Sequence, residues 1–552
     1  MTSGSAEALV TIVPALLLTM SLAIVSRISR RWTTHPRRVA DLLESPWAPA
    51  IAGVVTFAIV RLVWRSLAEP GVIHDERAYL LQAEIFARGH WTAPSPPLPD
   101  FFAQMHVFLQ PALFAKYPPG HALMLVPGIW IGLPGLMPAV LAGVTGGLTF
   151  WLARRLSNIW TALLTWLLWT TAPATLVWAA SYFSESTSAV MWLIAGWATV
   201  RWLDTGERRY LFGVSAALAW QFQTRPLTAI ALAAPLAIPI LRRLLQTRQW
   251  RDLIAPLMAA AVLLTPGPLW NQQTLGNWRL DPYPYYSKAY FPFDRPGFGV
   301  DPAPALRPVP RELAGMGDWS RAVHESYVPS AVPVELARRL LSVLRVYGAG
   351  WRLSIVFLLI GSLIHPSPAT RLSIAACASL FAAQLVFAHP PEWTVYYFEL
   401  LPMLHFLAAG ALVRLLAWFG RAADAPGELS ASVARAAAVA TVMLLPLCVS
   451  DLARVRADID RRNAFHRRAD EIVRDAPSHS ILFVRYPVAH SPHFAITRNE
   501  ADLSSARSWV VYDRGADNAR LQAIAPDRKA YLLDVAAFRL EPMDAAGLEH
   551  PH

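Results

Sequence analysis

The chain has 552 residues, of which 55% are hydrophobic and 16% charged, and its formal net charge is +11. Soluble globular domains typically carry about 25% charged residues, so the composition excludes an ordinary soluble protein and indicates a membrane protein. The positive charge does not indicate nucleic-acid binding, because the arginines cluster in short segments between apolar runs. Both cysteines, Cys377 and Cys448, lie inside such runs, which excludes a disulfide or a cysteine metal cluster in an exported domain.

The apolar runs predict about twelve membrane helices, since one crossing needs roughly 20 apolar residues. The predicted spans lie near 9–26, 48–66, 137–153, 159–178, 186–203, 210–224, 226–241, 253–270, 350–365, 371–388, 397–418 and 433–450. Arginine-rich segments follow the first, third, fifth and seventh spans, which predicts an N-terminus outside the cytoplasm. The first span has no basic residue before it, which favours a retained span over a signal peptide. Residues 1–450 are therefore predicted to form an all-α membrane domain.

Two long loops, 67–136 and 271–349, are then predicted to lie outside the cytoplasm. In the first loop, an amphipathic interfacial helix is predicted from Glu76 to Arg88. The shorter segment 120–134 is predicted to lie along the interface or to re-enter, with a pair of short spans as the alternative. The second loop ends in an amphipathic stretch, 335–347. Its leucines share one helical face and Arg339 lies outside that face, which predicts a helix on the bilayer surface.

The tail, residues 451–552, contains equal numbers of basic and acidic residues. A polar helix is predicted over 452–474, and strands are predicted over 481–486, 509–512 and 530–535, with a helix over 516–524. This order predicts a small α/β domain outside the cytoplasm.

An acidic pair, Asp75-Glu76, stands just outside an early span, and Lys116-Tyr117-Pro118-Pro119-Gly120-His121 follows it in the same loop. Asp75 could cap the predicted helix, because aspartate is a preferred N-cap residue. The pattern from Asp75 to Gly128 also resembles the first outer loop of protein O-mannosyltransferases and lipid A aminoarabinose transferases, which are GT-C glycosyltransferases. The extra first span and the α/β tail depart from those families, so their acceptors are not carried over.

The resemblance implies a GT-C-like membrane core and an inverting transfer of a sugar from a polyprenyl-phosphate donor to an acceptor outside the cytoplasm, which is a glycan, a lipid or a protein hydroxyl. Such a transfer needs a base, a cation or metal for the leaving phosphate, and a substrate groove. Asp75 is the candidate base. The other candidates are Glu76 and Glu185 for catalysis, Lys116, Arg225 and Tyr117 for the donor phosphate, and His121, Tyr396 and Tyr397 for the groove.

A divalent metal ion is left open as a cofactor, with Glu185, His106 and His389 as weak ligand candidates, because no His-x-x-x-His spacing occurs. Plainer alternatives exist for the basic candidates, since Lys116 and Arg225 could serve as interfacial anchors. The expected location is the bacterial inner membrane.

A transporter or flippase for a lipid-linked saccharide is the alternative function, and a non-catalytic scaffold is a further one. A transporter would favour charged residues inside several spans and inverted repeats between the halves of the chain. The predicted spans are nearly free of charge, and the carboxylates gather on one side, which favours the enzyme.

Overall fold

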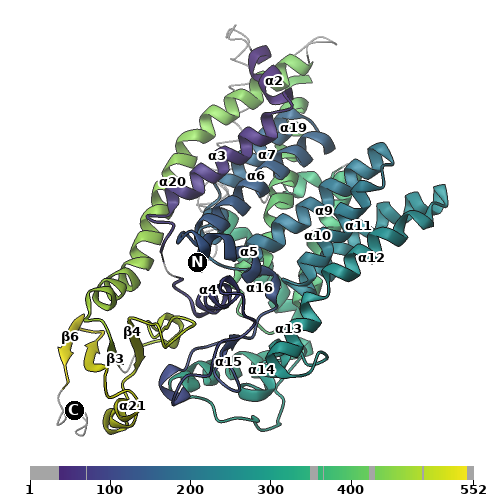
Figure 1. The fold of residues 1–552 in the computed structure, drawn as a ribbon. Coiled ribbons are helices and arrows are strands. Elements are labelled where there is room, and N and C mark those ends of the chain that lie inside the picture. Colours follow the sequence, from purple (N-terminus) through teal and green to yellow (C-terminus); the bar gives the residue numbers. More distant parts are fainter. Residues whose placement is uncertain are drawn as a thin grey trace.

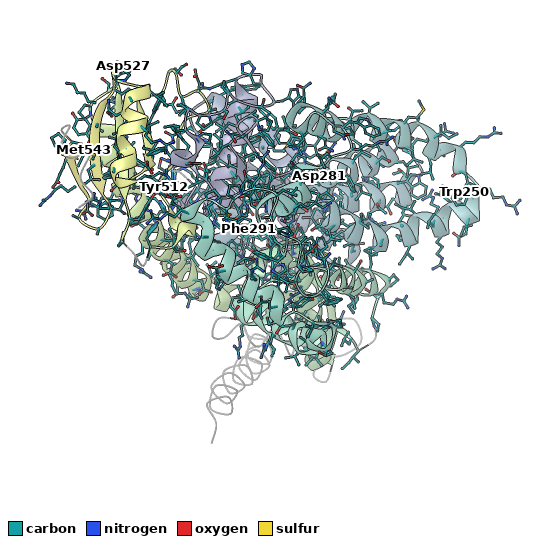
Figure 2. The ribbon with its side chains drawn as sticks, turned by 90° about the horizontal axis from the view of Figure 1, so that it is seen from below. Trp250, Asp281, Phe291, Tyr512, Asp527 and Met543 are labelled. Carbon is teal, nitrogen blue, oxygen red and sulfur yellow. The ribbon has the colours of Figure 1, made fainter. Side chains whose placement is uncertain are left out.

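The computed structural model describes residues 36–69, 71–348, 359–364, 366–421, 429–487 and 490–543. A body of packed helices makes up most of the molecule, and a small sheet domain lies at the end of the chain (Figure 1). From below, this sheet domain with Tyr512 lies at one side, and Asp281 and Phe291 lie between it and Trp250 at the far end (Figure 2).

The predicted spans coincide with helices wherever the structure describes them. The first set is α3 (Ala48–Val63), α6 (Leu136–Leu156), α7 (Ile159–Thr170), α8 (Pro173–Ala179), α9 (Glu185–Thr205), α10 (Arg209–Phe222), α11 (Pro226–Thr247), α12 (Ile254–Leu263) and α13 (Pro266–Leu275). The second set is α18 (Pro368–Gln384), the 3₁₀ helix η7 (Thr394–Leu400), α19 (Leu401–Arg421) and α20 (Leu429–Asp475). The predicted span 9–26 and most of 350–365 lie outside the described residues.

Four helical segments in the described part of the chain are long and apolar enough to cross a membrane. They are Leu136–Leu156, Pro226–Thr247, Trp250–Leu275 and Thr394–Leu415, and the number rises to six if two bent helix pairs each form one span. One of these pairs is α7 with α8, bent by 61°. The structure therefore confirms a multi-span helical protein, while the predicted number of twelve spans stays a prediction.

Small residues allow α3 and α6 to pack at close range. A Cβ atom on Gly146 would lie 2.3 Å from Thr56 Oγ1, and one on Gly147 would lie 2.8 Å from the carbonyl oxygen of Pro49. Side chains at these positions would push the helices apart, so glycine is required there. Such contacts are typical of membrane helices, where close van der Waals packing replaces the hydrophobic effect.

The two loops predicted to lie outside the cytoplasm, 67–136 and 271–349, are named the first and second outer loops after that prediction. In the first, α4 (His74–Ala87) begins two residues before the predicted start and α5 (Pro119–Trp130) follows the Lys-Tyr-Pro-Pro motif. The prediction of an amphipathic interfacial α4 is wrong, because both of its faces are covered. Arg77, expected on the polar face, is buried and donates hydrogen bonds to the Gly71 carbonyl and to His466 of α20. The 12 residues of α5 extend about 18 Å, which is too short to cross a bilayer.

The second outer loop contains α14 (Pro282–Tyr290), η4 (Arg311–Leu313), α15 (Ala314–Ser326), η5 (Pro329–Ala331) and α16 (Val332–Gly348). The predicted helix over 335–347 is therefore present within α16, while its place on the bilayer surface stays a prediction; Arg339, expected off the leucine face, lies on the buried side. Arg339 is fully buried and donates to the carbonyl oxygens of Gln384, Phe387 and His389 at 2.9–3.2 Å. These carbonyls follow the end of α18, where a cation is favourable.

The tail forms a four-stranded sheet in the order β4-β3-β5-β6, comprising β3 (Ser480–Arg485), β4 (Ser508–Tyr512), β5 (Lys529–Asp534) and β6 (Arg539–Pro542). β3 is parallel to both β4 and β5, and β6 is antiparallel to β5. The three predicted strands and the helix α21 (Asn518–Ile524) are confirmed, whereas β6 was not predicted. The predicted boundary at 450/451 falls inside the continuous helix α20.

Two phenylalanines from the first outer loop complete the core of this sheet domain. Phe101 and Phe102 lie in η2 (Pro99–Phe102), and their rings contact Phe483 and Trp509 with centroid distances of 6.3 and 5.9 Å. Both are nearly inaccessible to solvent and share a cluster with residues of β3, β4 and α21. The tail is thus built on the first outer loop.

We expect Phe101→Ala to loosen the sheet domain from the helical body. Truncating a buried phenylalanine typically costs about 3–5 kcal/mol, because it leaves a cavity. Limited proteolysis of the purified protein should then release the tail faster than in the wild type. Phe298→Ala, which removes a partly exposed ring, is the control; equal cleavage rates for the two variants would contradict the docking.

Candidate active site

The carboxylate of Glu76 fixes the start of α4. Its Oε2 atom accepts the backbone N–H groups of Val72 and Ile73 at 2.9 and 3.0 Å, and its Oε1 atom accepts the N–H of Tyr182 at 3.0 Å. Ile73 is the N-cap residue, so the alternative that Asp75 caps this helix is wrong. These contacts give the buried Glu76 a structural part, whereas its predicted catalytic role stays a prediction.

Asp75 is free to face other side chains because the Glu76 carboxylate already accepts the backbone N–H groups at the start of α4. Tyr117 donates its hydroxyl hydrogen to Asp75 Oδ1, and His74 Nε2 lies 3.0 Å from Oδ2. Burial by itself would raise the pKa of Asp75, but His74, His106 and the Tyr117 hydroxyl hold it well below its usual range. The carboxylate is therefore ionised at neutral pH and able to accept a proton.

Three histidines surround this carboxylate, and two of them were not predicted as site residues. His106 Nε2 lies 3.6 Å from Asp75 Oδ1, and the rings of His106 and His493 lie 4.6 and 4.4 Å from the ring of His74. His493 comes from the tail. Among the described residues, His74, Asp75 and His106 form the one group of three whose potential metal-ligand atoms lie within 4.8 Å of one another. Glu185 and His389 lie outside this group.

Lys116 is a buried cation enclosed by aromatic rings. Its Nζ atom lies 4.5 Å from the ring centroid of Tyr283, 5.1 Å from that of Tyr286 and 5.4 Å from that of Tyr117. Burial lowers the pKa of the ammonium group. No carboxylate in the described part of the chain lies within 4.0 Å of it, so its charge remains available to an anion.

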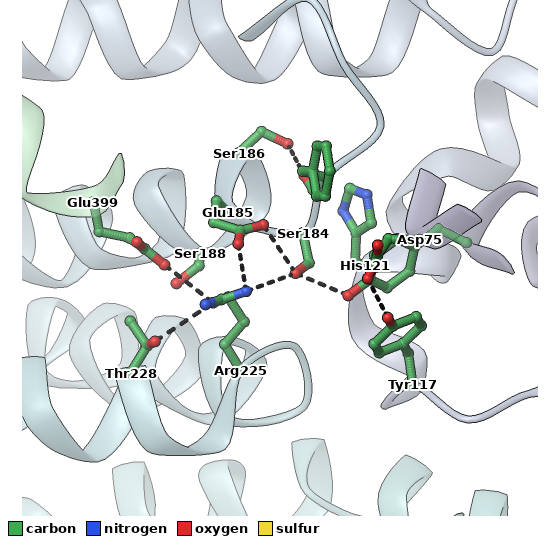
Figure 3. Close-up of polar contacts among 12 residues, drawn as sticks. Asp75, Tyr117, His121, Ser184, Glu185, Ser186, Ser188, Arg225, Thr228 and Glu399 are labelled. Atoms are coloured by element: carbon green, nitrogen blue, oxygen red, sulfur yellow. Dashed lines mark hydrogen bonds and ion pairs between the residues drawn. The ribbon is translucent and has the colours of Figure 1, made fainter. Parts of the chain in front are cut away.

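Arg225, by contrast, is already paired with two carboxylates (Figure 3). Its Nη1 atom donates to Glu185 Oε1 at 2.7 Å, and its Nε atom lies 3.4 Å from Glu399 Oε1. The guanidinium also lies 5.7 Å from the ring centroid of Tyr396. These contacts do not favour the predicted binding of a phosphate by Arg225, and they place Glu185 and Tyr396 on the same guanidinium.

The Asp75 and Arg225 groups form one connected arrangement. Tyr79 stacks on Tyr117 with a centroid distance of 4.4 Å, and its hydroxyl donates to Ser184 Oγ, which in turn accepts from Arg225. Gly120 brings the two groups close, because its N–H donates to the Gln223 carbonyl and a Cβ atom there would lie 2.6 Å from Thr224 Oγ1. The Tyr-Pro-Pro-Gly sequence therefore sets this close approach.

The remaining groove candidates are engaged by packing. His121 is fully buried, with Nδ1 2.8 Å from Thr187 Oγ1 and Nε2 2.8 Å from the Tyr182 carbonyl. Tyr397 is likewise buried, stacks on Phe381 and lies 3.3 Å from His389 Nε2. A pocket of about 240 Å³ lies beside Pro118 and Pro119, and its lining also includes Phe222, Gln223, Pro226, Leu264, Gly267, Pro268, Trp270, Asn271 and Asp281.

No protein-family model matches the sequence, and no curated protein matches it significantly. The structure is similar to that of ArnT from Cupriavidus metallidurans in the apo state, with a TM-score of 0.53 and 15% identity over 90% of this chain and 99% of ArnT. The chain has a GT-C fold. This confirms the predicted fold type.

Two further structures match less well. ArnT bound to undecaprenyl phosphate has a TM-score of 0.45 and 14% identity, over 82% of this chain and 84% of ArnT. The archaeal oligosaccharyltransferase AglB from Archaeoglobus fulgidus, in complex with an inhibitory peptide and a dolichol-phosphate, has a TM-score of 0.40 and 12% identity, over 89% of this chain and 70% of AglB.

We expect Arg225→Met to destabilise the protein far more than Glu185→Gln. Loss of the arginine leaves Glu185 and Glu399 buried without a counter-charge, a change that typically costs about 3–5 kcal/mol. The glutamine variant keeps the pair of Arg225 with Glu399. Thermal unfolding in detergent measures the difference, and similar midpoints for the two variants would show that Arg225 does not balance both carboxylates.

Proposed function

We propose that this chain is an inverting glycosyltransferase of the bacterial inner membrane, with its site and tail outside the cytoplasm. It moves a sugar from a polyprenyl-phosphate donor to an acceptor hydroxyl. The observation that supports this most directly is the pairing, in one outer loop of a GT-C fold, of an ionised carboxylate at Asp75 with a buried, unpaired ammonium at Lys116.

The chemistry needs one proton acceptor and one site for the leaving phosphate. As the acceptor oxygen attacks the anomeric carbon, its hydroxyl proton passes to Asp75. The bond between that carbon and the phosphate oxygen breaks, and the electron pair leaves with the polyprenyl phosphate. The Lys116 ammonium stabilises the negative charge of the leaving phosphate. This attraction is strong because the buried site largely excludes water.

The donor proposal combines the contacts of Lys116 with the fold match. Tyr283 and Tyr286 present aromatic faces beside the ammonium, and aromatic faces suit the apolar faces of a sugar ring. ArnT, whose apo structure shares this fold, has also been solved with undecaprenyl phosphate. The pocket beside Pro118 and Pro119 adjoins the same motif and is mostly apolar, which makes it a candidate for part of the lipid.

The groups around Arg225 have a positioning part in this proposal. Arg225 pairs with Glu185 and holds it next to Ser184. The Ser184 hydroxyl accepts a hydrogen bond from Tyr79, which stacks on Tyr117. Glu185 therefore orients the acceptor side of the site without taking the proton itself. The tail takes part in acceptor recognition, since its His493 covers one side of His74.

Asp75→Asn is the central test of this proposal. Asparagine keeps the shape of the side chain and still accepts the Tyr117 hydrogen bond, but it takes up no proton from the acceptor. Release of polyprenyl phosphate from lipid-linked sugars should fall by about a hundredfold or more, the scale of losing a positioned base. The thermal midpoint should change little.

Asp100→Asn, an exposed position in the same loop, is the matched control and should retain activity. Activity of the Asp75→Asn variant within a few-fold of the wild type would remove Asp75 from the mechanism. It would then favour a transporter or a scaffold, neither of which needs a base.

Tyr117→Phe should change the pH dependence of transfer. The Tyr117 hydroxyl stabilises the ionised form of Asp75, and hydrogen bonds to charged groups are worth about 1.5–3 kcal/mol. Without it the pKa of Asp75 rises, so the acid limb of the pH–rate profile should move upward by about 1–2 units. An unchanged acid limb would show that the titration of Asp75 does not control the rate.

A further inference from the structure

His106 is a half-buried histidine whose ring makes no hydrogen bond to the described residues. Its Nδ1 atom is buried and has no hydrogen-bond partner among the described residues, and its Nε2 atom lies 3.6 Å from Asp75 Oδ1, too far for a good hydrogen bond. Its backbone has φ = 66°, a left-handed conformation that non-glycine residues rarely adopt. The 3.6 Å gap between Nε2 and the carboxylate, in a ring held by a strained backbone, leaves room for a ligand that both atoms could bind.

The atoms around this gap have the spacing of a metal site. Two donors bound to one zinc ion at about 2.0–2.2 Å lie roughly 3.4 Å apart in a tetrahedral arrangement. His74 Nε2 and His106 Nε2 lie 3.0 and 3.6 Å from the two oxygens of Asp75, and the three groups offer ligand atoms within 4.8 Å of one another. His74 resembles His106 in having a buried Nδ1 atom without a partner among the described residues.

We propose that His74, Asp75 and His106 bind one divalent transition-metal ion, with zinc preferred over magnesium; Asp75 binds it through one carboxylate oxygen, and the other oxygen takes the acceptor proton. Two imidazoles and one carboxylate are the ligand set of many catalytic zinc sites, and imidazole nitrogen disfavours magnesium, which prefers oxygen ligands. Three protein ligands leave at least one position open. His493 of the tail covers the ring of His74 and keeps water from that side.

The open coordination position of the ion would bind the phosphate of the donor, and this part of the inference rests on the proposed function. One carboxylate does not neutralise a divalent ion, and Lys116 adds a second positive charge close to the same tyrosine, Tyr117. The site would then have a net positive charge suited to the phosphate of the donor. Tyr117 links the two halves, because it bonds to Asp75 and lies beside Lys116.

The direct test is zinc binding by the full-length protein, purified without a histidine tag. Its zinc content is measured by elemental analysis after loading with Zn²⁺ and desalting, and its affinity by titration. We expect about one ion per chain, which a tenfold excess of Mg²⁺ does not displace. In His106→Gly, zinc affinity should fall by at least roughly a hundredfold, beyond the 10- to 100-fold typical of losing an outer partner of a ligand.

Glycine is the informative substitution because it adopts φ = 66° without strain, so the loop keeps its conformation. The tail offers a matched control in His479→Gly: His479 also has a positive φ of 61° and bonds to an aspartate, Asp527, but belongs to no three-ligand group found among the described residues. This variant should bind zinc as the wild type does. In a separate measurement, zinc should raise the thermal midpoint of the wild type and not that of His106→Gly.

Absence of retained zinc in the wild type, or equal zinc affinity in His106→Gly and the wild type, would overturn the metal site. The outcome for the proposed function is separate. A protein that transfers sugar but binds no zinc overturns only the metal site, whereas one that binds zinc but leaves lipid-linked sugars intact overturns only the transferase.

Discussion

The site depends on one buried carboxylate, that of Glu76, which holds three backbone N–H groups in place. Glu76 accepts three backbone N–H groups, two at the start of α4 and one from Tyr182 in the loop before α9. It therefore joins the helix that presents Asp75 to the loop that presents Glu185, which are more than a hundred residues apart in the chain. Because Glu76 satisfies the helix start, the neighbouring Asp75 can turn toward Tyr117 and the histidines instead of capping.

Charge balance then separates the two cations of the site. Burying an ion without a partner is costly, so a buried charged side chain indicates either a partner within the protein or a charged ligand that binds there. Arg225 has its partners in Glu185 and Glu399, and it holds structure together. Lys116 has no carboxylate within 4.0 Å among the described residues, and the aromatic rings beside it stabilise a cation without neutralising it. Under the proposed function, this ammonium is where the anionic group of the donor would bind.

Local patterns predicted the parts of the molecule that local forces determine. Apolar length located the helices that coincide with the predicted spans, and alternating runs located three of the four strands in the tail sheet, whereas α14 and α15 were not predicted. Non-local contacts were not predictable in this way. The capping role of Glu76, the burial of Arg77 and Arg339, and the approach of His493 to His74 each depend on segments far apart in the sequence. Asp75, Lys116 and Tyr117 were predicted together because all three lie in the single loop 67–136.

The tail shows why a boundary drawn from composition misleads here. The change from apolar to charged residues near 450 is real, yet α20 continues through it to Asp475 as a single helix. Asn463 and Arg467 on this helix bond to Glu69, which precedes α4. Phe101 and Phe102 then enter the core of the sheet domain from the other side of the first outer loop. The tail and the loop thus fold against each other on both sides of Asp75, so the tail helps to define the shape of the site and should be treated as part of it.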